Sequence, residues 1–221
     1  MNYDYQKIRD LFNLSVPDSL PEKQITEIKD YFGAIPKALE DYYRLCGGCK
    51  EMNSAQDFLL TPDGIYSYKL KTWNYSDYCV FYVENQCCVE WAIKKSDLNM
   101  ENPPVYETYD SGETWNKICD SVSQYLISHA YLQAVFSFEY ASEDFFEADT
   151  KQIDEISKKF YHIDADSLIY NGVRFFQSYP DTIIAVINNN DEFFDIFYSS
   201  RSEQHFSEID NIICEIMMIN N

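Results

Sequence analysis

The stretch "DYCVFYVENQCCVEWAI", residues 77–93, is the strongest indication of the fold in this chain. Two runs rich in β-branched and aromatic residues flank Glu84-Asn85-Gln86, a pattern that predicts a β-hairpin. In the second run Trp91 and Ile93 are expected on one face of a strand, with Glu90 on the other. The chain should therefore contain an antiparallel sheet.

Helical patterns lie on both sides of this hairpin. Residues 19–32 predict a helix that Ser19 and Glu22 open with a capping box. A second helix is expected to begin at Pro36 and to end near Gly47. After a turn-rich loop over 99–113, the apolar spacing from Trp115 onward predicts a long amphipathic helix that ends near residue 131.

Beyond about residue 131 the pattern changes. The segment 138–155 holds seven acidic residues and one lysine. Residues 150–160 predict a helix, 182–200 a second hairpin that turns at 188–191, and 207–218 a closing helix. These residues form a C-terminal α+β extension.

The composition limits the classes of partner. The 221 residues are 46% hydrophobic, so the chain can bury a real core, and the formal net charge is −20. Such a field repels nucleic acid and anionic lipid and attracts basic partners. The acids can equally serve only to keep a surface rich in Tyr and Phe soluble.

Nothing in the sequence directs the chain to a membrane. The polar N-terminus has no signal-peptide pattern, and no apolar run approaches the roughly 18 residues of a membrane span. Seven cysteines without the spacing of a disulfide framework fit a reducing compartment. We therefore expect a cytoplasmic protein.

The segment Cys46-Gly47-Gly48-Cys49 is a CxxC motif, which can mark a redox couple or half of a zinc site. A redox cysteine needs the N-terminus of a helix, but Cys46 falls in the last turn of the expected helix, and "KEMNSAQDF" after Cys49 does not predict another helix. Zinc requires a second ligand pair, and the adjacent Cys87 and Cys88 should point to opposite faces. We therefore expect no metal and no cofactor, with Cys46 packing as a small apolar residue and the glycines shaping the turn.

The three histidines also give no catalytic pattern. None lies in a metalloprotease motif, and neither a nucleophile elbow nor a phosphate-binding loop occurs in the sequence. His129 continues the apolar stripe of the long helix, which favours a place at the edge of the core. A Cys–His pair brought together by folding stays open as an alternative. We expect no catalytic residues.

Several segments in a fixed order resemble the SUKH superfamily, bacterial immunity proteins related to the Smi/Knr-type fungal cell-wall regulators. Its pattern includes Leu/Ile-Pro before a helix that ends in Gly-Gly, a hairpin with a Trp, a (D/N)PPV-Y element and a last helix with a Phe-Leu-like pair. Asn102 stands where Asp is common, and Tyr125-Leu126 stands where Phe-Leu is common. The matching segments are "GAIPKALEDYYRLCGG" (33–48), "FLLTPDGIYS" (58–67), "YCVFYVENQCCVEWAI" (78–93), "NPPVYE" (102–107) and "WNKICDSVSQYLISHAY" (115–131).

The resemblance covers residues 19–130 and implies a fold. The expected class is α+β, a mostly antiparallel sheet flanked by helices. Residues 1–130 would form the SUKH-like core domain. Residues 131–221 would form the extension, either folded separately or packed on the same sheet.

The resemblance also implies a function. Many members are thought to bind and neutralise a cognate toxin, often a nuclease, in polymorphic or contact-dependent toxin systems, and they are not known as enzymes. A chain at −20 suits a basic toxin, because charge complementarity speeds the encounter. A general protein-interaction scaffold of the Smi/Knr type, without a toxin partner, is the main alternative, and an enzyme that uses Cys or His is a third.

A toxin-binding protein of this kind would steer its partner with exposed acids. The primary candidates share the acidic segment 138–155, and the secondary candidates share predicted loops. The primary set is Glu143, Asp144, Glu147 and Asp149, and the secondary set is Asp57, Glu107 and Asp110.

Overall fold

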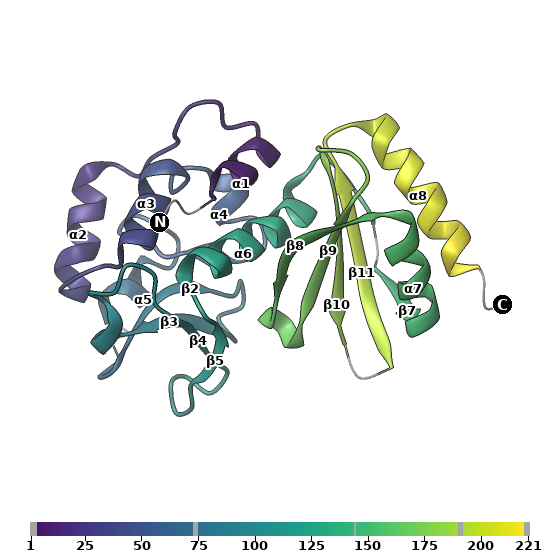
Figure 1. Ribbon diagram of the computed structural model, residues 1–221. Coiled ribbons are helices and arrows are strands. Elements are labelled where there is room, and N and C mark those ends of the chain that lie inside the picture. Colours follow the sequence, from purple (N-terminus) through teal and green to yellow (C-terminus); the bar gives the residue numbers. More distant parts are fainter. Residues whose placement is uncertain (1–3, 73–74, 144, 190–191, 219–221) are drawn as a thin grey trace. The chain divides into compact units, whose positions relative to one another are not determined.

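The computed structural model describes residues 4–72, 75–143, 145–189 and 192–218. The chain divides into two compact units, unit 1 (Met1–Gln133) and unit 2 (Ala134–Asn221). The division falls inside helix α6 (Val122–Ser137), within a turn of the boundary expected after residue 130. Figure 1 shows the elements of both units, and each unit is described by itself below.

Unit 1 contains one antiparallel sheet. Its strands are β1 (Phe58–Leu59), β2 (Tyr78–Val83), β3 (Glu90–Lys94), β4 (Val105–Thr108) and β5 (Asn116–Cys119), in the order β1-β2-β3-β4-β5. The predicted hairpin is confirmed, because Cys79 pairs with Ile93 and Val83 with Glu90. Cys87 lies in the turn with a φ of 61°, so the second strand begins later than the alternation suggested.

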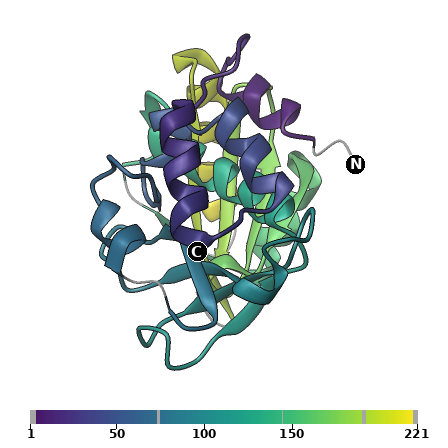
Figure 2. The same cartoon turned by 90° about the vertical axis from the view of Figure 1, so that its left-hand side faces the viewer.

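The helices of residues 6–53 lie on one side of this sheet (Figures 1 and 2). In α2, Ile25, Ile28 and Phe32 are buried, and Gly33 ends the helix in the left-handed region at φ 84°. The predicted capping box is wrong, because α2 begins at Glu22 and the Ser19 hydroxyl donates to the Leu20 carbonyl. The helices are α1 (Gln6–Leu11), α2 (Glu22–Phe32), α3 (Lys37–Leu45), α4 (Lys50–Asn53), α5 (Ser67–Thr72) and the 3₁₀ turn η1 (Lys95–Asp97).

The long helix starts later than the sequence predicts. Residues 116–119 form strand β5, and α6 begins only at Val122. Asn102, from the Asn-Pro-Pro segment, accepts a hydrogen bond from the Ser123 amide at 2.9 Å and so satisfies one of the first N–H groups of the helix. This partner is distant in sequence, and local periodicity therefore could not reveal the start.

Aromatic packing joins α6 to the sheet of unit 1. The Tyr125 ring lies 5.4 Å from Phe81, 6.0 Å from Tyr82 and 6.0 Å from Trp91, measured between centroids. All four of these side chains are fully buried. Buried aromatic side chains dominate the energetics of cores, so this cluster fixes α6 on β2 and β3.

Gly47 is required for close packing rather than for an unusual backbone angle. Its φ is not positive. A Cβ at this position would lie 2.7 Å from the Tyr43 carbonyl oxygen, 2.9 Å from Tyr43 Cα and 2.8 Å from Leu20 Cγ. The backbone of α3 therefore leaves no room for a side chain here.

Gly47→Val is expected to lower the free energy of unfolding by about 3 kcal/mol, because the added side chain forces the backbone of Tyr43 to move. Chemical denaturation of the variant and the parent chain measures this difference. Cys49→Ala, in the same segment, is the control and should cost clearly less. Equal losses for the two variants would contradict the packing account.

Unit 2 has its own antiparallel sheet, so residues 134–221 do not extend the sheet of unit 1. The order is β6-β11-β10-β9-β8, and β7 also pairs with β11. The elements are β6 (Tyr140–Ala141), β7 (Phe146–Asp149), α7 (Thr150–Lys159), β8 (Tyr161–Ser167), the 3₁₀ turn η2 (Ile169–Asn171), β9 (Val173–Gln177), β10 (Thr182–Asn188), β11 (Phe193–Ser200) and α8 (Glu203–Met217).

Helices α7 and α8 cover one face of this sheet (Figure 1). Ile153, Ile156 and Ile213 from the helices pack in one cluster with Ile184 and Ile196 from the strands. The helices at 150–160 and 207–218 and the hairpin at 182–200 are confirmed, although α8 begins earlier, at Glu203. The turn of that hairpin at residues 190–191 lies outside the described residues.

The predicted α+β class is confirmed, with antiparallel sheets of five and six strands flanked by helices. In the described part of the chain, no helix has the length and apolar character needed to cross a lipid bilayer.

Candidate partner-binding site

Asp57 is wrong as an exposed partner-binding residue. Its side chain is fully buried, and its Oδ2 lies 3.0 Å from His129 Nε2. His129 on α6 is itself enclosed by the rings of Tyr82 and Trp91, at centroid distances of 4.3 Å and 5.2 Å. The carboxylate therefore serves the interior of unit 1, where an ionisable group requires a polar partner.

Glu107 is also wrong as an exposed loop acid. It lies on strand β4 and is 8% exposed. Burial raises the pKa of this carboxyl to about 7, and interactions with Trp91 and Tyr109 oppose the increase. Glu107 is therefore partly neutral at physiological pH and does not belong to a steering surface.

The raised pKa of Glu107 makes part of the stability depend on pH. The folded chain holds this proton up to about pH 7, whereas the ordinary value is 4.5. The contribution of the protonated Glu107 carboxyl to the free energy of unfolding is fully present below about pH 4.5, and it is lost as the pH rises to about 7. Glu107→Gln should therefore stabilise the chain relative to the parent by about 2 kcal/mol more at pH 8 than at pH 5.

Denaturant unfolding at both pH values measures this difference. Glu113→Gln, at an exposed position, is the control for loss of one charge. If the Glu107→Gln difference is the same at pH 5 and pH 8, the buried carboxyl does not titrate as described.

Asp110 is exposed, as the loop assignment predicted, but it organises its own turn. Its carboxylate accepts hydrogen bonds from the Thr108 hydroxyl at 2.7 Å and from the Thr114 amide and hydroxyl at 2.9 Å and 2.6 Å. These bonds, chiefly those from Thr114, lower the pKa of Asp110 to about 2. It belongs to unit 1 and not to the acidic segment.

Two of the four primary candidates are exposed acids on unit 2. Glu143 and Glu147 both face solvent, and among the described residues neither has a hydrogen-bond or ion-pair partner. Asp149 is half-buried and caps α7, because it accepts from the Gln152 amide in a full capping box. Asp144 lies outside the described residues.

A further acid, Asp195, lies directly beside Glu147. The two residues face each other in the register of β7 and β11, where like charges destabilise a sheet. Their neighbours Phe146 and Ile196 belong to the helix-covered face, so Glu147 and Asp195 lie on the opposite face. The sequence could not indicate Asp195, because the pairing of β7 with β11 joins distant segments.

An exposed aromatic ring accompanies these acids. Phe145 is 53% exposed and lies 5.8 Å from the Phe197 ring. We call Glu147 and Asp195, together with Phe145, the acidic surface of unit 2, whereas Glu143 lies near Tyr198 and Asp210 on the helix-covered side. Residues 134–221 contain 17 acidic and 5 basic residues, a formal charge of −12 within the −20 of the chain. Most of the negative field therefore comes from the unit that carries this surface.

The thiols of Cys46, Cys49 and Cys79 are buried. Burial raises the pKa of Cys46 to about 12 and that of Cys79 to about 11, and it also raises the pKa of Cys49. These thiols are therefore protonated at neutral pH. The expectation that no helix follows Cys49 is wrong, since α4 begins at Lys50, but α4 has only four residues.

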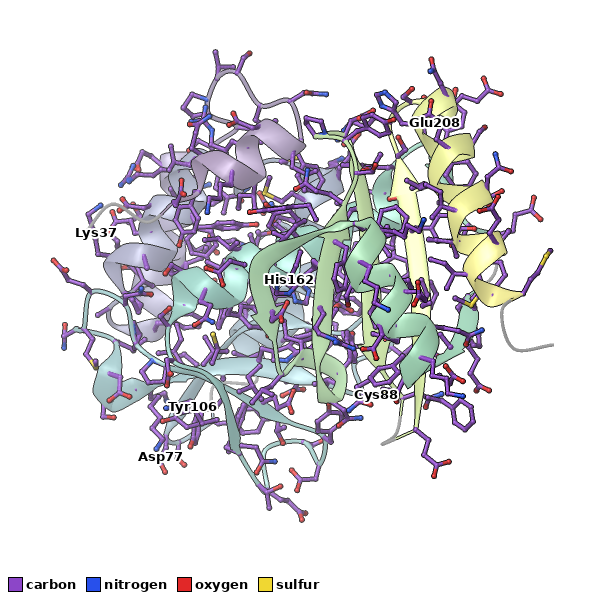
Figure 3. All side chains as sticks on the ribbon, turned by 45° about the vertical axis from the view of Figure 1, so that its right-hand side comes forward. Lys37, Asp77, Cys88, Tyr106, His162 and Glu208 are labelled. Carbon is purple, nitrogen blue, oxygen red and sulfur yellow. The ribbon has the colours of Figure 1, made fainter. Side chains whose placement is uncertain are left out.

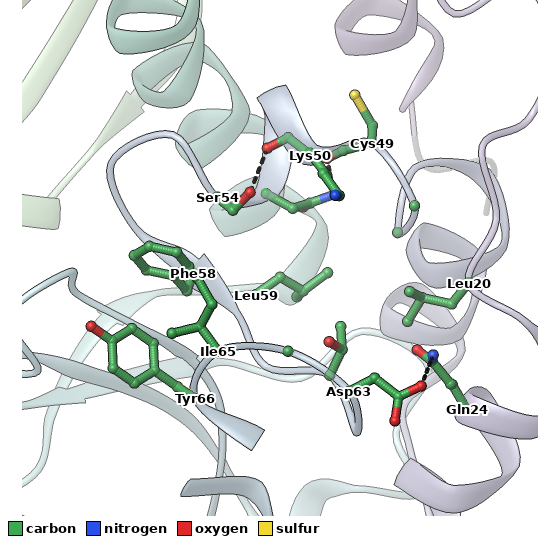
Figure 4. A pocket seen from close by; sticks show the side chains of 15 residues that line it. Leu20, Gln24, Cys49, Lys50, Ser54, Phe58, Leu59, Asp63, Ile65 and Tyr66 are labelled. Atoms are coloured by element: carbon green, nitrogen blue, oxygen red, sulfur yellow. Dashed lines mark hydrogen bonds between the residues drawn. The ribbon is translucent and has the colours of Figure 1, made fainter. Parts of the chain in front are cut away.

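A pocket of about 360 Å³ in unit 1 is lined by Gly47, Gly48 and Cys49 of the CxxC segment, together with Leu59 and Ile65 (Figure 4). In this view the Cys49 side chain points away from Leu59 and Ile65. The pocket lining thus gives no role to the thiol. Over the ranges that the structure describes, no group of three or more His, Cys, Asp or Glu side chains is arranged to hold a metal ion.

The histidines of unit 2 are each paired with a carboxylate. His162 on β8 (Figure 3) lies 2.9 Å from Asp166, and His205 lies 2.8 Å from Asp181. The His205 ring also stacks on Tyr179 at 3.9 Å. Tyr179 donates its hydroxyl to Glu208 on α8, so this cluster ties the β9–β10 connection to the helix.

Comparison of the chain with protein-family models, with curated proteins and with solved structures finds no match.

Proposed function

We propose that this chain is an immunity-type binding protein that neutralises a cognate basic toxin, such as a nuclease, by direct protein–protein binding. It acts in the cytoplasm, without catalysis and without a cofactor. The observation that carries the proposal is the acidic surface of unit 2, where Glu147 is exposed, has no ion-pair partner among the described residues and lies beside Asp195. The order of SUKH-like segments in unit 1 supports the same function.

The local electrostatics favour a basic partner. Glu147 and Asp195 repel each other across β7 and β11, and a partner lysine or arginine placed between them would relieve that repulsion. A nuclease must present basic surface to nucleic acid, so an acidic protein can occupy the surface that its substrate needs. Complementary charge also raises the association rate, which suits an inhibitor that must act before damage occurs.

The direct test is co-purification with a candidate basic toxin encoded beside this chain, together with survival of cells that express this toxin. We expect a stable complex with the parent chain and protection of the cells. The variant Glu147→Lys, Asp195→Lys should protect less, whereas Asp154→Lys, Asp164→Lys changes the same charge at exposed positions elsewhere on unit 2 and should still protect.

The absence of a complex, together with the absence of protection, would contradict the proposal. Binding to several unrelated proteins without any toxin partner would instead favour the general scaffold.

A further inference from the structure

We propose that unit 2 holds a pocket that binds the guanidinium group of an arginine side chain. The pocket has a volume of about 390 Å³ and lies on the helix-covered side of the sheet. Its lining combines three aromatic rings with two carboxylates: Ala141, Ser142, Glu143, Phe146, Tyr198, Phe206 and Asp210. The inference rests on the proposed function in one respect only: the arginine would come from the proposed basic partner. The chemistry of the pocket is argued from its own residues.

The aromatic wall is a continuous stack. Tyr198 lies 6.2 Å from Phe146 at an interplanar angle of 19° and 5.6 Å from Phe206 at 23°. Tyr198 is 1% exposed, whereas Phe146 and Phe206 are half-buried and packed against the core of unit 2. The wall is therefore pre-organised, and a planar guanidinium group can stack on such rings.

The two carboxylates come from different elements. Glu143 follows β6, and Asp210 lies on α8, where its Oδ1 accepts the Tyr198 hydroxyl at 2.5 Å. Burial, followed by the charge and hydrogen bond of Asp210, raises the pKa of Tyr198 well above its ordinary value. The tyrosine therefore stays a donor, holds Asp210 in place and leaves the other carboxylate oxygen free to accept further hydrogen bonds.

No basic side chain is part of the lining in the portion of the chain that the structure describes. The charge of Glu143 and Asp210 is thus open to a cation from outside. A metal ion would need more oxygen ligands than two carboxylates and Ser142 supply, and no metal-holding group is found among the described residues. Arginine offers five donors in a plane, which matches carboxylates on two sides and rings along the wall.

The test uses N-acetyl-arginine-methylamide as the probe and the isotopically labelled full chain as the protein. Binding is followed by NMR at physiological ionic strength, through the amide signals of Ala141, Ser142 and Asp210. We expect saturable shifts centred on these residues. The citrulline analogue, which has the same shape without the charge, should bind at least about tenfold more weakly.

Asp210→Asn should weaken arginine binding by about tenfold, whereas Glu215→Gln, which removes one charge at an exposed position of the same helix outside the pocket, should retain it. The inference is overturned if the arginine shifts do not saturate, if citrulline binds equally well, or if Asp210→Asn has no effect in a folded variant. Because the probe replaces the toxin, these results do not depend on whether a toxin complex forms.

Discussion

Asp57→Ala is expected to lower the free energy of unfolding by about 3 kcal/mol, because it leaves the buried imidazole of His129 without the carboxyl group that lies 3.0 Å from its Nε2. Both side chains are at most 1% exposed, so water cannot replace the lost partner. Against the 5–15 kcal/mol typical of a domain, such a loss would leave much of unit 1 near its folding threshold.

Denaturant titration followed by tryptophan fluorescence, to which the buried Trp91 contributes, measures the effect of Asp57→Ala. Asp63→Ala is the matched control, since Asp63 lies just beyond β1 and is exposed, and it should change stability by less than about 1 kcal/mol. A loss for Asp57→Ala no larger than for Asp63→Ala would show that the buried pair is not needed.

Lys69→Met is expected to cost a similar amount, about 3–5 kcal/mol. Lys69 on α5 forms an ion pair with Glu90 on β3, and the two side chains are 2% and 3% exposed. Without the ammonium group, Glu90 keeps the hydroxyl of Tyr75, which donates to Oε2 at 2.7 Å, but its charge is no longer balanced.

The double variant Lys69→Met, Glu90→Gln removes both charges and should recover a large part of the stability lost by Lys69→Met. A double-mutant cycle on unfolding free energies gives the coupling between the two positions. Strictly additive losses would contradict the view that an unbalanced buried charge is the source of the effect.

The elements that sequence alone predicted are those with strong local patterns. The hairpin at 77–93 has two β-rich runs around a short turn, and α2 has a regular apolar stripe that Gly33 terminates. These patterns depend only on residues close in sequence, so they can be recognised without knowing which distant segments pack against them.

The elements that sequence missed depend on distant contacts. The turn-rich composition of residues 99–113 predicts a loop, but Val105–Thr108 form strand β4 because they pair with β3 on one side and β5 on the other. Ile118 on strand β5 is separated from Val122 and Tyr125 on α6 by intervals typical of one helix face. The sequence therefore predicts a single helix where the structure has a strand followed by a helix. Tertiary pairing decided both segments.

The candidate site shows the same limit. The density of acids within 138–155 points to Glu143 and Glu147, whose side chains are exposed. It could not separate them from Asp149, which caps a helix, nor add Asp195, which β11 brings beside β7. Asp57 and Glu107 resembled exposed acids because burial by partners far along the chain leaves no local pattern.

The most direct test of the account measures the association rate of the chain with the proposed basic toxin by stopped flow at ionic strengths from about 0.02 to 0.5 M, where screening changes most. The acidic surface predicts a rate that falls steeply with salt. For Glu147→Lys, the rate at low salt should be lower and the salt dependence flatter, while Asp154→Lys should follow the parent more closely. An association rate indifferent to salt, and unchanged by Glu147→Lys, would contradict the account.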